Sequence, residues 1–381
     1  MLHFTDTEFA GRLARTEAEM ERRGLDGMLV FAPESQYWLT GYDTFGYCFF
    51  QCLVLGGVEP VLLTRSADLR QAQLTSTIGD VRIWVDRDGA TPADDLQALL
   101  ADLGLAGKRL GIETDTHGLT AANYKKLAAA LDGRAELVEA SDLISELRLV
   151  KSEAEIIYAR RAAELSDDAL DAALDKIGPG ADEGEILAAL QGAIFAGGGD
   201  FPANPVIIGS DRHALLCRSH SGRRKLSGRD QITLEWAGAY RNYHAPMMRT
   251  VVVGEPRDSH RRMNEAAVAA LQAAEACLKP GNPMGLVYDA YARTMDAAGF
   301  GHARLNACGY AVGARYAPSW MEHQMFYHGA PTVIRPGMTF FLHMIMMDSR
   351  TGTAMCPGRT SLVTEAGAEP LSRHGLGLLC R

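Results

Sequence analysis

The sequence has no run of about 18 uncharged apolar residues, the length that a membrane-spanning helix needs. Its first 23 residues carry acidic and basic side chains throughout, with no apolar stretch of the kind that a secretory signal contains. We therefore expect a cytoplasmic protein that has no membrane partner.

Cysteine is scarce and forms no recognisable pattern. Seven cysteines occur in 381 residues, and the only close pair is Cys48 and Cys52, separated by three residues. No second cysteine or histidine pair follows at zinc-finger spacing. We expect free thiols in a reducing compartment.

Positive charge is in deficit. The chain has 38 Lys and Arg against 47 Asp and Glu, a net charge of -9, and no basic stripe offsets it. Such a surface repels phosphate backbones, so a nucleic-acid partner is not expected. The composition, 47% hydrophobic and 22% charged, is that of a folded globular protein.

Hydrophobic patterning predicts two domains, residues 1–146 and 147–381. The first alternates strands with helices, which indicates an α/β domain; its expected strands are 28–32, 49–55, 58–63, 81–85, 110–113 and 137–139, with a turn at 33–35. The second separates helix pairs from runs of strands, which indicates an α+β domain. Its expected helices are 153–177, 183–195, 260–277 and 286–298, and its expected strands are 206–209, 231–236, 240–243, 249–253, 311–313, 339–347 and 360–364.

Two ionisable residues stand inside apolar strands of the second domain. Glu235 lies in ITLEW and His343 in FFLHMI. A buried charge or imidazole is costly unless it is paired or used in function. Glu235 on an edge strand with a solvated side chain, and His343 as a hydrogen-bonded core histidine, remain the alternatives. The sequence contains no G-x-S-x-G or H-E-x-x-H motif and no nucleotide-binding glycine loop.

Two segments are rich in aromatic residues and are expected to be loops. Residues 306–323 read NACGYAVGARYAPSWMEH, and residues 41–52 read GYDTFGYCFFQC. Aromatic faces attract cations, so both suit a small cationic ligand. A hydrophobic contact between domains or subunits is the alternative. If residues 316–323 form a surface lid, Trp320→Ala should weaken substrate binding more than it weakens the fold.

The order of motifs resembles the creatinase/prolidase/methionine aminopeptidase superfamily along nearly the whole chain. The motifs are YWLTGY, ELRLVKSEAEI, SHSGRRKLSGRDQITLEWAG, YHAPMMRT, GYAVG and RTSLVTEAGAEPLS. The resemblance implies an α/β creatinase-type N-terminal domain, an α+β pita-bread catalytic domain and a homodimer.

The metallopeptidases of this superfamily bind two metal ions through two Asp, one His and two Glu. The resemblance places those positions at Glu235, Pro246, Tyr310, His343 and Gly358 of this sequence. Pro, Tyr and Gly are not ordinary ligands of a divalent ion, so we expect neither a dinuclear centre nor another cofactor. The second active-site histidine of the peptidases falls near Ala317, whereas His220 matches a histidine that contacts substrate.

Within the superfamily, the chain is most similar to ectoine hydrolases and creatinase. WLTGYDTFGYCFFQC, GYAVGARYAPSWMEH and LEWAGAYRNYHAPMMRT resemble ectoine hydrolase segments. Residues 323–328, HQMFYH, depart from the Arg-Thr of that pattern, as does the strand around His343. The departures affect the expected substrate more than the expected chemistry.

The resemblance predicts a metal-independent hydrolase that opens a C–N bond of a small zwitterionic, nitrogen-rich molecule. Glu235 would be nucleophile or base, His220 would exchange a proton with the substrate nitrogen, and His343 would complete the catalytic set. The expected substrate-binding residues are Phe45, Tyr47, His244, Tyr310, Tyr316, Trp320 and Glu322. A creatinase-like amidinohydrolase, an Xaa-Pro peptidase, a lyase and a non-catalytic binding protein remain alternatives.

Overall fold

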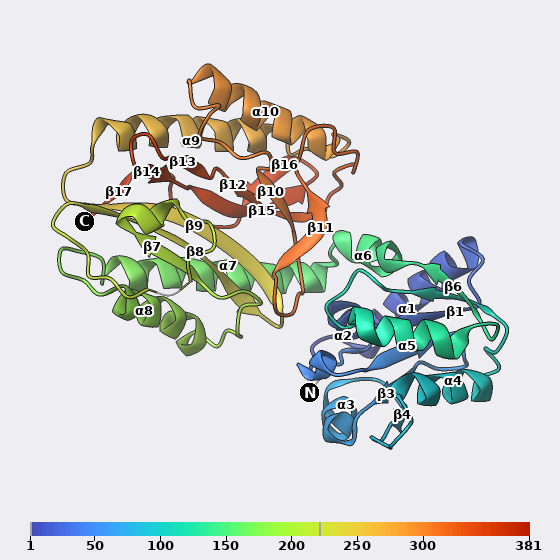
Figure 1. Ribbon diagram of the computed structural model, residues 1–381. Helices are drawn as coiled ribbons and strands as arrows, with labels where there is room; N and C mark the ends of the chain where they lie inside the picture. The colour runs from blue at the N-terminus through green and yellow to red at the C-terminus, as the bar shows by residue number, and fades with distance from the viewer. Residues whose placement is uncertain (1, 221) are drawn as a thin grey trace. The chain divides into compact units, whose positions relative to one another are not determined.

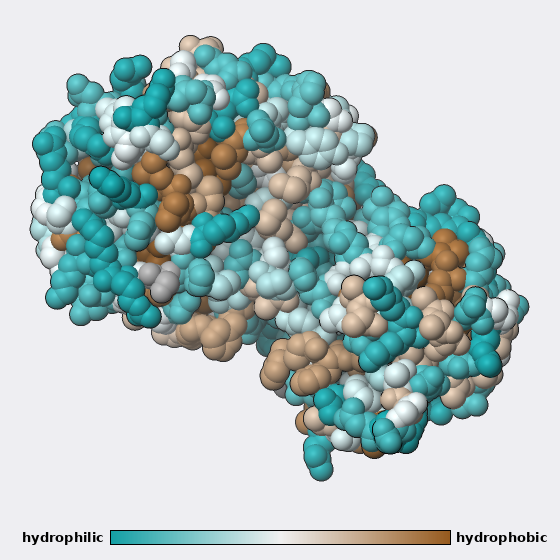
Figure 2. All heavy atoms as spheres, viewed as in Figure 1, coloured by the Kyte–Doolittle hydropathy of each residue, from teal (hydrophilic) through white to brown (hydrophobic). Residues whose placement is uncertain are grey.

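The computed structural model describes residues 2–220 and 222–381. The chain forms two compact units, Met1–Arg148 and Leu149–Arg381, each with its own hydrophobic core (Figure 1). The visible face is mostly hydrophilic, with scattered hydrophobic patches (Figure 2). None of the described helices is long and apolar enough to cross a membrane.

The N-terminal unit is a mixed six-stranded sheet with helices on both faces. The strand order is β4-β3-β2-β1-β5-β6, with β1–β2 and β2–β3 antiparallel and the other pairs parallel. The strands are β1 (Gly27–Val30), β2 (Cys52–Leu55), β3 (Val61–Thr64), β4 (Asp80–Ile83), β5 (Arg109–Ile112) and β6 (Glu136–Glu139). The helices are α1 (Asp6–Arg22), α2 (Pro33–Thr40), α3 (Leu69–Thr75), α4 (Pro92–Asp102), α5 (Ala121–Leu131) and α6 (Ser141–Leu149), with short 3-10 turns η1 (Gly46–Cys48) and η2 (Ser66–Asp68).

Side chains alternate between the two faces of this sheet. Leu29 packs in the core that includes α4 and α5, whereas Met28 and Val30 pack with residues of α1, α2 and α6. This period of two is what an extended strand imposes when both of its faces are covered.

The expected turn at 33–35 is wrong, because these residues begin helix α2. Pro33 is well placed in the first helical turn, where a missing backbone N–H costs nothing. The Glu113 carboxylate accepts hydrogen bonds from the backbone N–H groups of Phe31 and Ala32 and from the Ser35 hydroxyl. This tertiary contact fixes the start of the helix from a residue distant in sequence.

The C-terminal unit is a nine-stranded sheet carrying two helix pairs. Its main strand order is β11-β10-β12-β15-β9-β8-β7, with β16 paired to β15 and β17 to β9. The strands are β7 (Ile207–Ser210), β8 (Asp230–Tyr240), β9 (Tyr243–Val253), β10 (Gly309–Val312), β11 (Met321–Met325), β12 (Thr339–His343), β15 (Gly358–Thr364), β16 (Gly367–Pro370) and β17 (Leu379–Cys380), and β13 (Met346–Asp348) pairs with β14 (Thr353–Met355). The helices are α7 (Glu153–Leu174), α8 (Glu183–Ala196), α9 (Asp258–Cys277) and α10 (Met284–Ala297), with a 3-10 turn η3 (Asp211–Leu215).

The helix pairs cover different halves of the sheet. Residues of α7 and α8 share a core with β7, β8 and β9, and residues of α9 and α10 share one with β10 and β12 (Figure 1). The antiparallel hairpin β8–β9 lies between β15 and the edge strand β7 and carries Glu235.

Three expected elements of this unit differ from the structure. The expected strand 339–347 is divided into β12 and β13, which belong to different sheets. Residues 240–243 are not a strand: Arg241 and Asn242 have φ of 53° and 64° and form the two-residue turn of the hairpin. Residues 306–323 are not one loop, because they contain β10 and the start of β11, which pair antiparallel. Only residues 313–320 connect the two strands.

Candidate active site

A row of paired residues across the central sheet brings Glu235 and His343 together. Glu235 of β8 pairs with Met248 of β9, Met248 pairs with Gly358 of β15, and Gly358 pairs with His343 of β12. Glu235 and His343 thus lie on one row across the same sheet, with β9 and β15 between their strands.

Glu235 is buried, with 5% of its surface exposed. Burial raises the pKa of its carboxyl to about 7, and the Arg218 charge and a Tyr310 hydrogen bond oppose that rise. The Tyr310 hydroxyl lies 3.5 Å from Oε1 of Glu235. The edge-strand alternative is wrong, because β8 lies between β7 and β9. Near neutral pH this carboxyl can both accept and donate a proton.

Trp320 connects with the carboxylate through Tyr310. Its indole Nε1 donates a hydrogen bond of 2.8 Å to the Tyr310 hydroxyl, and its backbone N–H donates to Asn204 Oδ1 at 2.9 Å. The Trp320 side chain is fully buried in a cluster with Phe341 and Met248. The surface-lid interpretation is therefore wrong: Trp320 is core, and its ring holds Tyr310 in place.

Two buried histidines each have a nitrogen without a hydrogen-bond partner among the described residues. His343 lacks one at Nδ1, and its ring lies 5.6 Å from that of Tyr310. His244 accepts the Ala203 N–H at Nε2, at 2.9 Å, which leaves the proton on its unpartnered Nδ1. Burial lowers the pKa of both rings to about 4, so both are neutral at pH 7. Buried polar atoms of this kind are suited to binding a polar substrate.

Glu322 belongs to a buried charged group beside this cluster. Arg315 Nη1 lies 3.4 Å from Glu322 Oε2, and both side chains are buried. A Cβ on Gly313 would lie 3.0 Å from Glu322 Oε1 and 3.5 Å from Lys151 Nζ. Glycine at that position therefore leaves room for the charged groups.

Tyr316 lies at the margin of the cluster. It is half-buried, and its hydroxyl accepts a hydrogen bond of 3.2 Å from the Asn242 side chain. The β10–β11 connection is thereby joined to the turn of the β8–β9 hairpin.

Of the three other predicted residues, one lies on the surface of the C-terminal unit and two lie in the N-terminal unit. His220 is exposed, and its Nδ1 lies 3.3 Å from the Arg218 carbonyl oxygen; no hydrogen bond from its ring to Glu235 is present in residues 2–220 and 222–381. Phe45 and Tyr47 lie at η1 of the N-terminal unit, where Phe45 is 79% exposed and Tyr47 is half-buried. Their roles stay predictions.

The sequence interpretation missed residues just before His220. The Arg218 charge lowers the pKa of Glu235, against the larger effect of burial, which raises it. It also lowers the pKa of His343, where the larger effect of burial acts in the same direction. Burial, and then the Glu235 charge, raises the pKa of the Cys217 thiol, whose sulfur lies 3.5 Å from Met347 Sδ. Their position two and three residues before a predicted catalytic histidine was the one available signal.

Comparison with known proteins decides the family. Residues 158–365 match metallopeptidase family M24, and residues 12–150 match the creatinase/prolidase N-terminal domain. The chain belongs to metallopeptidase family M24. The predicted superfamily and fold class are confirmed.

The relatives of this M24 protein are named for different activities. It is 31% identical to the ectoine hydrolase of Halomonas elongata, over 97% of this chain and 96% of that protein. It is 23% identical to an Xaa-Pro dipeptidase of Pyrococcus furiosus, over 97% of this chain and 99% of that protein. The dipeptidase PepE of Mycobacterium ulcerans has a similar fold, with a TM-score of 0.86, 25% identity and 99% of both chains covered. Family membership and the ectoine hydrolase likeness support hydrolase activity.

The metal ions that the family name implies do not fit this donor set. Among the described residues, no three His, Cys, Asp or Glu side chains are grouped to hold a metal ion. At Gly358 a Cβ would lie 3.0 Å from the Leu342 carbonyl oxygen and 3.1 Å from the His343 Cβ, so even a small side chain there is crowded. Tyr310 is bonded to Trp320, and burial keeps its pKa well above the usual range, so it is not a phenolate ligand. Two isolated ligands do not make a dinuclear centre.

Proposed function

We propose that this M24 protein is a metal-independent hydrolase that opens a C–N bond in a small zwitterionic, nitrogen-rich compound, in the manner of an ectoine hydrolase. The observation that carries the proposal is a buried carboxylate, Glu235, with a pKa of about 7, in a site where Pro246, Tyr310 and Gly358 occupy three of the five positions that hold metal ligands in the metallopeptidases. A base or nucleophile poised near neutral pH replaces a metal-bound hydroxide.

The chemistry follows from the groups around Glu235. The carbon of an amidinium is the electrophile, and Glu235 either attacks it or removes a proton from the attacking water. The oxygen of water ends on that carbon, one C–N bond breaks, and the departing nitrogen gains a proton. His220 is the proposed donor of that proton. Tyr310 Oη, His343 Nδ1 and His244 Nδ1 are the polar atoms proposed to hold the substrate, with Glu322 and Tyr316 further along the same wall.

An Xaa-Pro peptidase is the second candidate, because dipeptidases share both the fold and the family. A peptide bond is a poorer electrophile than an amidinium, and the dinuclear centre that would activate it lacks a donor set here. A creatinase-like amidinohydrolase needs no such centre. It is a further candidate that differs from the proposed enzyme in its substrate.

One experiment tests the proposal on the full chain. Protein treated with a strong chelator is assayed with ectoine, creatine and an Xaa-Pro dipeptide, alongside Glu235→Gln and an exposed control, Glu265→Gln. We expect turnover of ectoine or another cyclic amidine to survive chelation, and Glu235→Gln to lower kcat by about 10²–10⁴. The control should turn over normally.

Contrary results are equally clear. Two metal equivalents per chain whose removal abolishes activity would establish the peptidase-type centre instead. Normal turnover by Glu235→Gln would make that residue structural. Acid quenching of a single turnover, followed by mass spectrometry of the peptide that contains Glu235, then separates direct attack, which leaves the substrate fragment covalently bound to Glu235, from base catalysis, which leaves Glu235 unmodified.

A further inference from the structure

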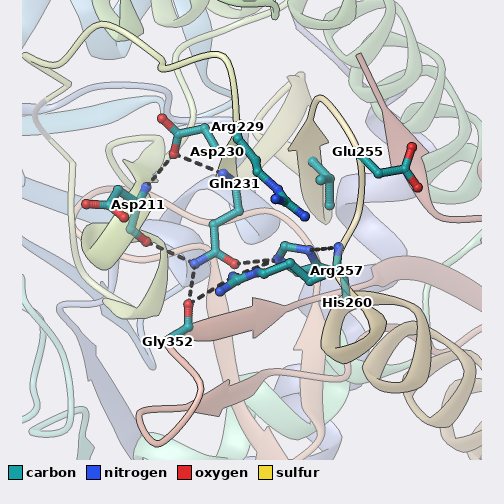
Figure 3. Close-up of a pocket in the computed structure, with 9 residues that line it drawn as sticks. Asp211, Arg229, Asp230, Gln231, Glu255, Arg257, His260 and Gly352 are labelled. Atoms are coloured by element: carbon teal, nitrogen blue, oxygen red, sulfur yellow. Dashed lines mark hydrogen bonds between the residues drawn. The ribbon is translucent and has the colours of Figure 1, made fainter.

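A second polar pocket lies at the start of β8, beside Asp230 and Gln231. Glu235 lies further along the same strand. It has a volume of about 320 Å³ and is bounded by the starts of η3, β8 and α9 and by the turn between β13 and β14 (Figure 3). That volume is sufficient for a small organic or inorganic anion. None of its lining residues belongs to the Glu235 site.

The base of this pocket is fixed by Gln231. Its Nε2 donates to the carbonyl oxygens of Asp211 and Gly352, at 3.1 and 2.8 Å. Its Oε1 accepts from Ala354 N at 3.1 Å and lies 3.0 Å from His260 Nε2. Because every polar atom of this amide is used, the pocket wall is held in one arrangement.

His260 reveals an excess of hydrogen-bond donors in the pocket. Gln231 Oε1 can only accept, so Nε2 of His260 carries the proton, and Nδ1 accepts the Arg257 backbone N–H at 3.3 Å. Arg257 Nη1 and Nη2 donate to the carbonyl oxygens of Thr351 and Gly352, each at 3.3 Å, and Nη2 also lies 3.1 Å from that protonated Nε2. Two donors face each other there, an arrangement that a bound anion would relieve.

Arg229 adds a second guanidinium. Its side chain extends toward Arg257 and His260 (Figure 3), and in the described part of the chain it makes no hydrogen bond or ion pair through that guanidinium. After burial, the charges of Arg257 and Arg229 are the further causes that lower the pKa of His260, to about 4. Both arginines therefore act on the same small volume.

The carboxylates of the pocket are mostly engaged elsewhere. Asp230 pairs with Arg224 at 2.6 Å, and Glu255 pairs with Arg261 at 2.6 Å. The Glu255 carboxylate points away from the two arginines (Figure 3). Exposed Asp211 is the remaining acid, so the lining retains a positive charge around Arg229 and Arg257.

We propose that this pocket binds a small oxyanion, a carboxylate or a phosphate, between the guanidinium groups of Arg229 and Arg257. Planar guanidinium groups bind both anions through paired N–H donors, and such charge-assisted bonds are the stronger kind. The site is separate from the hydrolytic one and does not depend on the proposed substrate.

Binding to the full chain is measured by isothermal titration calorimetry with inorganic phosphate and with malonate, at constant ionic strength. We expect saturable one-to-one binding of at least one probe, weakened at least tenfold in Arg229→Gln, because one bidentate contact is lost. Arg293→Gln, which removes an exposed charge from α10 outside the pocket, should bind within twofold of the unchanged protein. Arg229→Lys should recover part of the affinity.

Binding of phosphate alone identifies a phosphate ligand, and binding of malonate alone a carboxylate. Absence of saturable binding of both probes, or equal affinity in Arg229→Gln and the unchanged protein, would overturn the proposal. Arg229→Gln removes no internal side-chain hydrogen bond seen in the described residues, so its fold should hold; melting curves check this. Glu235→Gln should bind the probes normally, which separates this inference from the proposed hydrolysis.

Discussion

Glu235 shows how burial converts an ordinary carboxyl into a group that titrates near neutral pH. It lies on an interior strand, with the Tyr310 hydroxyl and the more distant Arg218 charge offsetting only part of the desolvation. If this position had only a structural role, a neutral side chain would make the fold more stable than a carboxylate does. Retaining the carboxylate therefore has an energetic cost, which is typical of residues selected for function.

The stability of Glu235→Gln should depend on pH. The pKa of Glu235 is about 7 in the folded protein and 4.5 in the reference state. The stability that the protonated form of Glu235 gives the fold is therefore complete below pH 4.5 and is lost as the pH rises through 7. We expect the variant to be more stable at pH 8, by up to roughly 3 kcal/mol, and little changed at pH 4. Urea denaturation at both pH values, with Glu265→Gln as control, measures this. An equal effect at both values would contradict the raised pKa.

Trp320 contributes to stability as well as to the site. Trp320→Ala should lower the free energy of unfolding by roughly 3–5 kcal/mol, because it empties a large volume of a fully packed cluster. Trp320→Phe keeps most of the ring volume and removes the donor to Tyr310, so it should cost less stability while still impairing turnover. Thermal melting and steady-state kinetics of both variants test this. An unchanged melting temperature for Trp320→Ala would restore the surface-lid interpretation.

At the scale of elements, the pairing of β15 with its neighbours requires a residue without a side chain at 358. The backbone of β12 lies on one side of Gly358 and Met248 of β9 on the other. A Cβ at 358 would lie 3.0–3.1 Å from atoms of β12, so any side chain there requires β12 to shift by a few tenths of an ångström.

Gly358→Ala should therefore destabilise the protein by about 1–3 kcal/mol, the usual cost of overpacking. Gly178→Ala is the matched control, since a Cβ there meets nothing within 4 Å and its φ is not positive. Chemical denaturation of the two variants gives the difference directly. Equal stability would show that β12 and β15 separate easily, and would remove the steric argument against a ligand at 358.

At the scale of the whole molecule, the chain is two units with independent cores, and we propose that it associates as a cytoplasmic homodimer. Phe201 is 83% exposed and its ring lies 4.7 Å from that of Phe195, which is 38% exposed. Exposed aromatic pairs of this kind are common at surfaces that are covered in an assembly.

Light scattering should give a molar mass twice the chain's 41.2 kDa at micromolar concentration. Phe201→Ser should shift the equilibrium toward monomer if the aromatic pair is buried in the dimer. The exposed substitution Leu74→Ser, in the N-terminal unit, is the control. A mass of one chain for the unchanged protein would contradict the proposal.

The sequence by itself determined the fold class, most of the regular elements and two of the buried ionisable residues, Glu235 and His343. Amphipathic periodicity is local, so helices such as α7, α8 and α9 are visible in it, and charged or imidazole side chains within apolar strands mark Glu235 and His343. Motif order along the chain also fixed the superfamily, because it preserves the spacing of the site residues.

Only the tertiary structure decided how these residues are used. The start of α2 depends on Glu113, the hairpin turn at Arg241 and Asn242 depends on the pairing of two 11-residue strands, and the burial of Trp320 depends on strands brought together from distant parts of the chain. The second pocket likewise combines Arg229, just before β8, with Arg257 and His260 at the start of α9. Long-range pairing and desolvation are properties of the assembled sheet, and for that reason local sequence patterns carry no direct signal of them.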